Sequence, residues 1–208
     1  MLLHKMAENI SDFFVRNQII RVRQKAIYSY GIELLLSGIC SVLGVCIISI
    51  LLNDIVGYLL FLIGFVPFRL WAGGYHADSH IKCMGCFAVF YLTAYSLVRF
   101  AIILQSEIIG CLLSGIAFVL IGILAPLGHP NKKLTKEKII KNRFRSRWLA
   151  IVFCGVAVAS YLLRIGNISV LQLLSGEFLA AISLVAGKIK MNRMQYDSGK
   201  EGFYEKDE

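Results

Sequence analysis

Long apolar stretches alternate with short polar segments along most of the chain. Six stretches approach the length of a membrane span, at residues 34–52, 55–68, 84–98, 108–127, 148–163 and 168–187. A helix needs about 20 mainly apolar residues to cross a bilayer, so the second, third and fifth are short. The pattern predicts an all-α, polytopic membrane protein with about six transmembrane helices between residues 34 and 187.

The two ends of the chain show different patterns. In residues 1–30 apolar side chains recur at near-helical spacing with basic residues between them, which predicts an amphipathic helix lying on the inner leaflet. A helix that grips a membrane-bound partner fits this pattern equally well. Residues 188–208 are polar and predict a cytoplasmic tail. We expect all of residues 1–208 to form one membrane domain.

The basic residues indicate the orientation of the spans. With a cytoplasmic N-terminus, 20 of the 22 Lys and Arg residues fall on the inner side, and only Arg99 and Arg164 face out. Basic residues favour the cytoplasmic side of short loops. The sequence therefore predicts a multi-pass protein of the cell membrane with both termini inside.

The amino-acid composition limits the classes of partner and function that fit this chain. Charged residues make up 17% of the chain, against about 25% in ordinary soluble domains, and 57% of residues are hydrophobic. The net charge of +9 is concentrated in part in residues 132–147, where Phe144 is the single aromatic residue. Base-stacking aromatics are otherwise missing there, so we expect contact with anionic lipid of the bilayer and no nucleic acid partner.

One polar segment carries candidate chemistry, namely residues 69–83 between the second and third stretches. Ionisable groups so close to hydrocarbon are costly and usually functional. Gly73 and Gly74 break a helix and permit positive φ or close backbone approach. Asp78 or Ser79 can cap the next helix, which places Cys83 in its first or second turn. The positive end of a helix favours a thiolate there.

Three interpretations of this segment stay open from spacing alone. Cys83 and His76 form a nucleophilic dyad if the chain turns back, with His80 as the rival base one turn from the cysteine. Alternatively, His76, His80 and Cys83 fall on one face of a helix, an arrangement that suits zinc. In the third interpretation the polar residues only anchor the segment at the membrane interface.

The segment Arg69…Gly73-Gly74-Tyr75-His76-Ala77…Cys83, set between two spans, resembles the AgrB family of bacterial accessory gene regulator membrane endopeptidases. The chain length, the basic amphipathic start and the Lys-rich segment before the last two spans are similar as well. The resemblance covers most of the chain, and the Gly-Gly-x-His-Ala…Cys core is its specific part.

The resemblance implies a cysteine endopeptidase that cleaves a small AgrD-like propeptide at the cytoplasmic side. It implies that Cys83 forms an acyl-enzyme and that His76 assists it. An internal Cys or Ser of the peptide then closes a thiolactone or lactone for quorum sensing. We expect Arg69, Gly73, Gly74, Asp78 and Ser79 to be supporting or substrate-binding residues. The resemblance implies no cofactor and no metal, and it is compatible with a homodimer.

The alternative function is a non-enzymatic carrier or channel that exports a small peptide or solute. A carrier predicts ionisable residues near the middle of several spans. Glu177 is the single ionisable residue that falls well within a predicted span, so the sequence disfavours this alternative.

Overall fold

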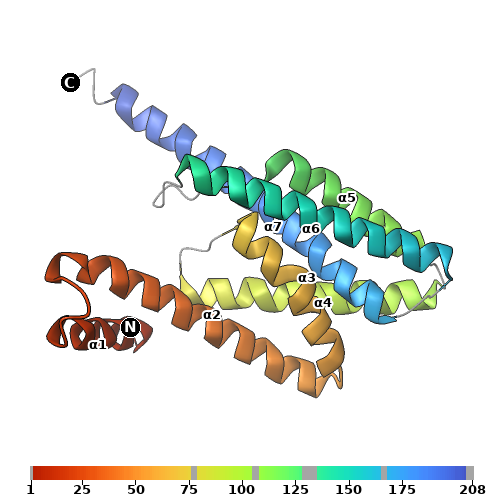
Figure 1. The fold of residues 1–208 in the computed structure, drawn as a ribbon, viewed down its shortest axis with the longest axis horizontal. Helices are drawn as coiled ribbons and strands as arrows, with labels where there is room; N and C mark the ends of the chain where they lie inside the picture. Colours follow the sequence, from red (N-terminus) through yellow and green to blue (C-terminus); the bar gives the residue numbers. More distant parts are fainter. Residues whose placement is uncertain (1, 76–78, 105–107, 128–134, 165–167, 205–208) are drawn as a thin grey trace. The chain divides into compact units, whose positions relative to one another are not determined.

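The computed structural model describes residues 2–75, 79–104, 108–127, 135–164 and 168–204. These residues form seven α-helices and a short 3-10 turn, and they contain no strand (Figure 1). The all-α prediction is therefore confirmed. In chain order the elements are α1 (Leu2–Arg16), η1 (Val22–Gln24), α2 (Lys25–Leu51), α3 (Ile55–Trp71), α4 (His80–Ile103), α5 (Ile108–Leu124), α6 (Lys136–Leu162) and α7 (Ile168–Tyr204).

Each predicted apolar stretch corresponds to one helix from α2 to α7. The four helices α2, α4, α6 and α7 contain segments long and apolar enough to cross a membrane. Helices α3 and α5 are apolar but have 17 residues each, a rise of about 26 Å against a hydrocarbon core of about 30 Å. The stretch expected to reach residue 127 ends as a helix at Leu124, just before Ala125 and Pro126, because the residue before a proline disfavours helical geometry.

The amphipathic start is shorter than one helix over residues 1–30. Helix α1 ends at Arg16, where Gln18 takes a positive φ of 58°. The Ile19 N–H donates to Phe14 O at 2.9 Å and the Gln18 N–H donates to Val15 O at 3.0 Å. These two bonds form a Schellman motif, which satisfies the last carbonyls of a helix and reverses the chain. Residues 25–30 consequently belong to α2.

The chain divides into two compact units. Unit 1 comprises residues 1–53 and 77–89, and unit 2 comprises residues 54–76 and 90–208. Helix α4 contributes its first half to unit 1 and its second half to unit 2. The cysteine and the histidine proposed from the sequence therefore belong to different units.

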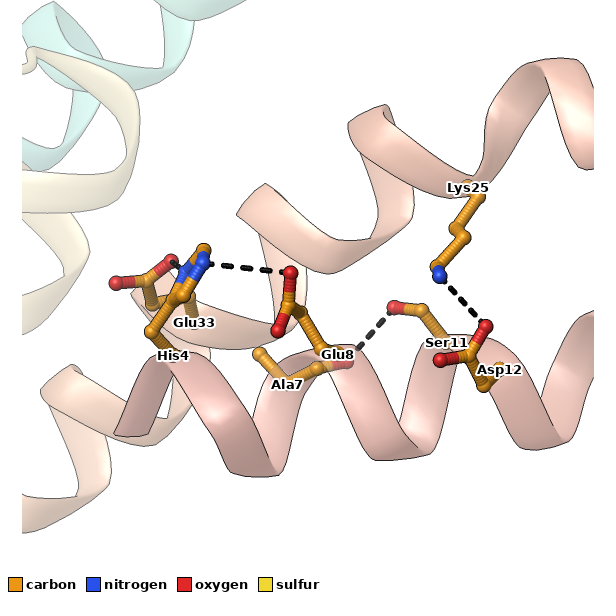
Figure 2. A network of polar contacts seen from close by, with 7 residues as sticks. All are labelled: His4, Ala7, Glu8, Ser11, Asp12, Lys25 and Glu33. Atoms are coloured by element: carbon orange, nitrogen blue, oxygen red, sulfur yellow. Dashed lines mark hydrogen bonds and ion pairs between the residues drawn. The ribbon is translucent and has the colours of Figure 1, made fainter. Parts of the chain in front are cut away.

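In unit 1, α1 packs along the start of α2 through a narrow face. Ala7 and Ser11 are fully buried, and the Ser11 hydroxyl donates to Ala7 O at 2.8 Å. Two ion pairs, here called the α1–α2 clip, join the helices: His4 with Glu33 at 3.0 Å and Lys25 with Asp12 at 2.6 Å (Figure 2). Helix α1 is thus tied to α2 by exposed charges on either side of a small buried face.

Helix α7 is the central helix of unit 2. It packs against α3, α5 and α6 (Figure 1). More than half of its apolar stretch is buried. A Cβ at Gly176 would lie 2.6 Å from Phe61 O, and one at Gly64 would overlap Leu173 O. The α3 and α7 backbones therefore touch at this glycine pair, as small residues allow in membrane helices. Beyond the bundle α7 continues to Tyr204, so the predicted polar tail begins as part of this helix.

Aromatic side chains fill the core of unit 2 between α3 and its neighbours. Tyr58 meets Tyr91 edge to face at 5.2 Å between centroids, and Phe68 meets Phe153 at 5.4 Å. The first end of α3 is fastened by Asp54, whose carboxylate accepts from Gln172 Nε2 at 2.6 Å and from Tyr91 Oη at 3.0 Å. Asp54 therefore ties the start of α3 to α4 and α7, and Phe68 packs the end of α3 against α6.

Candidate active site

The turn after α3 is built on two glycines. Gly73 and Gly74 have φ values of +87° and +147°, a region that favours glycine. A Cβ at Gly73 would lie 2.6 Å from Leu127 O. One at Gly74 would overlap Arg69 Nη1 and lie 2.7 Å from Ser183 Oγ. The expectation of positive φ and close backbone approach at this pair is confirmed.

Both main-chain groups of Tyr75 are held by neighbouring elements. The Tyr75 N–H donates to Ser183 O at 2.9 Å, with Ser183 Oγ at 3.2 Å. Arg69, in the last turn of α3, donates from Nη2 to Tyr75 O and from Nη1 to Ser183 Oγ at 3.4 Å. We call Arg69 and Ser183, closed around Tyr75, the Tyr75 cradle. Arg69 thus acts on the protein's own backbone in this structure.

A second set of contacts surrounds this cradle. The Leu127 N–H donates to Ala72 O at 2.8 Å, which joins the end of α5 to the turn. A Cβ at Gly187 would lie 2.8 Å from Gly74 C and 2.9 Å from Tyr75 N, so α7 lies directly against the turn. Three elements, α3, α5 and α7, therefore determine where the turn ends.

Basic side chains lie over the aromatic rings at this end of unit 2. The Arg145 guanidinium is 5.9 Å from the Trp71 ring centroid, and Lys190 Nζ is 5.2 Å from that of Tyr75. Nearby on α6, Arg147 donates to Gly122 O at 2.8 Å. Aromatic rings with adjacent bases are typical of a membrane–water interface on the cytoplasmic side.

The cysteine lies at the start of α4, in unit 1. Ser79 precedes the helix, and its Oγ accepts the Lys82 N–H at 3.3 Å while its carbonyl accepts the Cys83 N–H at 3.0 Å. This is the N-cap expected from the sequence, and it places Cys83 in the first turn. Cys83 and Cys86 are both half-buried free thiols. A first-turn thiol lies close to the positive end of the helix dipole.

The remaining predicted site residues lie outside the described part. His76 and Asp78 belong to residues 76–78, and the side chain of His80 is likewise not described. Neither the dyad of His76 with Cys83 nor the alternative zinc site is therefore placed by the structure. Among the described residues, no group of three or more His, Cys, Asp or Glu side chains gathers as metal ligands.

Glu177 lies in the middle of α7, as the apolar pattern indicates, and its side chain is fully buried. The Ser114 hydroxyl of α5 donates to Glu177 Oε2 at 2.8 Å, and Oε1 has no hydrogen-bond partner. Ser114 therefore joins α5 to α7 at this carboxyl. The contact belongs to the helix packing of unit 2, away from the turn after α3.

Sequence reasoning missed Ser183 and Gly187. Both were expected only as part of the last span, because a serine or a glycine inside an apolar helix is common. A signal was present nonetheless, since Ser183 and Gly187 stand four residues apart and form the small-xxx-small pattern of close helix packing. That pattern indicates a close neighbour without identifying it as the turn after α3.

Comparisons with known proteins point to the same family as the resemblance in residues 69–83. The family model AgrB, Accessory gene regulator B, matches residues 7–184. A curated protein of Lactiplantibacillus plantarum (strain ATCC BAA-793 / NCIMB 8826 / WCFS1), described as a putative AgrB-like protein, is 26% identical over 191 residues. The aligned region covers 90% of this chain and 93% of that protein. No solved structure matches the chain.

Proposed function

Because the chain belongs to the accessory gene regulator B family, we propose that it is a membrane-embedded cysteine endopeptidase that cleaves and cyclises a small autoinducer propeptide. Family membership supports a role in quorum-sensing peptide processing. The finer proposal assigns Cys83 as the nucleophile and His76 as its base. The observation that carries it is the half-buried Cys83 thiol in the capped first turn of α4, within the matched region.

The proposed first step is acyl transfer to sulfur. The Cys83 thiolate attacks the carbonyl carbon of the scissile peptide bond, and His76 holds the proton taken from the thiol. The tetrahedral intermediate collapses, the C–N bond breaks, and the leaving amine of the C-terminal fragment takes the proton from the imidazolium. The N-terminal part of the propeptide remains on Cys83 as a thioester.

The second step releases the ring. A thiol or hydroxyl within the bound peptide attacks the thioester carbonyl and gives its proton to the neutral His76. The tetrahedral intermediate then expels the Cys83 thiolate and releases the thiolactone or lactone. Exchange of one thioester for another conserves the bond energy, so no nucleotide is consumed. Water would hydrolyse the same acyl-enzyme, and a site at the membrane face, next to apolar helices, limits its access.

Several residues support these steps in the proposed mechanism. Gly73 and Gly74 form the turn that leads into His76, and Arg69 binds that turn. Ser79, with Asp78 before it, begins the helix that carries Cys83. The distribution of basic residues favours the cytoplasmic side for this segment, where a propeptide lying on the inner leaflet would have a raised local concentration.

A matched pair of cysteine substitutions tests the proposal. We expect Cys83→Ala to abolish release of the C-terminal fragment when the purified protein is reconstituted in nanodiscs with its propeptide. Cys86→Ala is the control, because Cys86 is also a half-buried thiol of α4 but lies three residues further from the start of the helix, a rise of about 4.5 Å. Full activity of Cys83→Ala, or loss confined to Cys86→Ala, would refute the assignment.

A further inference from the structure

Helix α7 binds the turn that precedes the histidine. Ser183 is 1% exposed, and its carbonyl and hydroxyl both face the Tyr75 N–H, at 2.9 and 3.2 Å. Most buried serines in membrane helices bond to their own helix, as Ser175 does with Gln172 O at 2.7 Å. Ser183 instead directs its hydroxyl to another element, which suggests a role beyond helix packing.

Arg69 completes the contact from the opposite side of the same residue. Its guanidinium binds Tyr75 O with one nitrogen and Ser183 Oγ with another. Arginine suits this position because its planar fork presents donors in a fixed geometry, which a lysine ammonium does not. The Tyr75 N–H and C=O are therefore both occupied by side-chain or backbone groups of α3 and α7.

Holding the Tyr75 carbonyl has a consequence for the next residue. A peptide unit is planar, so the carbonyl oxygen of one residue and the Cα of the next lie in one plane. A donor fixed on Tyr75 O therefore restricts the direction in which the chain enters residue 76. Small misplacements of a reacting group can lower a rate by about 10²-fold, so this restriction matters for a base.

We propose that Ser183 is a positioning residue, which acts with Arg69 to hold Tyr75 and thereby sets the reach of His76. This proposal rests on the proposed function, because it requires His76 to act as the base. In this proposal Arg69 acts through the geometry of its guanidinium, which binds Tyr75 O and Ser183 Oγ together. Gly187 belongs to the same device, since its missing side chain allows α7 to lie against Gly74.

Substitution of Ser183 separates positioning from substrate binding. We expect Ser183→Ala to lower kcat about tenfold and to change KM by less than about twofold, because the hydroxyl touches the turn and not the peptide. Ser175→Ala is the matched control: Ser175 is on the same helix and fully buried, but its hydroxyl bonds within α7. Control and variant should keep wild-type yield and thermal stability within a few degrees.

Arg69→Lys tests whether the forked guanidinium of Arg69 is needed or whether its positive charge is enough. The lysine retains the positive charge but cannot bind Tyr75 O and Ser183 Oγ together. We expect kcat to fall about 10²-fold with little change in KM, and the combination with Ser183→Ala to fall no further than Arg69→Lys alone, because both substitutions open one cradle. If only the positive charge of Arg69 mattered, for example in binding the substrate, lysine would preserve kcat and any effect would fall on KM.

Hydrogen exchange distinguishes failure of this inference from failure of the proposed function. The Tyr75 amide should exchange faster in Ser183→Ala and Arg69→Lys than in the wild type and in Ser175→Ala. Faster exchange with reduced kcat supports the proposal. If the wild type is active and the two variants keep its kcat, the proposal is wrong. It is also wrong if the Tyr75 amide exchanges at the wild-type rate in both variants. If wild-type protein shows no Cys83-dependent cleavage, the proposed function fails whatever the exchange data show.

Discussion

The turn at residues 72–75 and the helix start at residues 79–83 are close in sequence but are held in different ways. The turn is fixed by α3, α5 and α7, through Arg69, Leu127 and Ser183. The helix start is fixed locally, by an exposed Ser79 cap within its own helix. Contacts of the first kind resist displacement because three packed elements would have to move together.

This difference teaches which residues should be sensitive to substitution. Buried contacts that converge on one backbone segment lose both hydrogen bonding and packing when one partner changes. Exposed contacts are weakened by water and salt, and they contribute little individually. We therefore expect substitutions in the turn before His76 to reduce activity strongly. Substitutions around Cys83, other than of the thiol itself, should have smaller effects.

The largest effect is expected from replacing a histidine, and one histidine follows the turn while another lies at the helix start. His76 follows the turn, whereas His80 is the first residue of α4. Loss of a general base costs about 10²- to 10⁴-fold, so His76→Ala should reduce cleavage by that factor, while His80→Ala should stay within about tenfold of the wild type. Single-turnover cleavage in nanodiscs measures both. Equal losses, together with stoichiometric zinc in the purified protein, would favour the zinc site instead.

The next effect concerns the turn itself. Gly74→Ala adds a Cβ that overlaps Arg69 Nη1 at a φ of +147°, so the Tyr75 cradle has to open. We expect cleavage to fall about 10²-fold at unchanged substrate binding. Gly115→Ala is the control, because a Cβ at that α5 position meets nothing within 4 Å. Wild-type kcat in Gly74→Ala would show that the turn tolerates movement and would remove the contrast between the two regions.

The smallest effect concerns the exposed α1–α2 clip. The pKa of His4 is raised above 6.5 chiefly by its hydrogen bond to Glu33, with the charges of Glu8 and Glu33 adding and the N-terminal amine opposing. A raised folded-state pKa means that this contribution to α1 docking is complete below pH 6.5 and is lost as pH rises through the raised value.

Proteolysis at the Asn17–Gln18 connection measures this docking. Cleavage there should increase modestly between pH 6 and pH 8 in the wild type, and His4→Gln should abolish the pH dependence while leaving the connection intact. An identical pH profile in His4→Gln would assign the change to another group.

The sequence predicts the elements of this molecule better than the contacts between them. Apolar stretches locate all six helices from α2 to α7, because each must satisfy its backbone internally in a membrane. Gly73, Gly74 and Ser79 are recognisable because positive φ and capping are local requirements. The break at Gln18 was missed, since a Schellman motif commonly uses glycine and here a glutamine takes the positive φ.

The role of Ser183 could not be predicted for a different reason. Its partners, Arg69 and Tyr75, are more than 100 residues away, and their meeting depends on how α7 crosses α3 at Gly64 and Gly176. Helix crossings depend on the complete set of packed side chains, which no short motif encodes. The segment that carries the family resemblance includes Arg69 and Tyr75 but not the serine that binds them.

The central claim is that Cys83 carries the peptide as a thioester, and trapping that intermediate tests it most directly. A propeptide whose internal Cys or Ser is changed to Ala cannot close the ring, so the acyl-enzyme should accumulate. Intact mass should rise by the N-terminal fragment less one water, the adduct should map to residue 83, and neutral hydroxylamine should release it as a hydroxamate. An adduct on Cys86, or release of the C-terminal fragment in Cys83→Ala, would contradict the account.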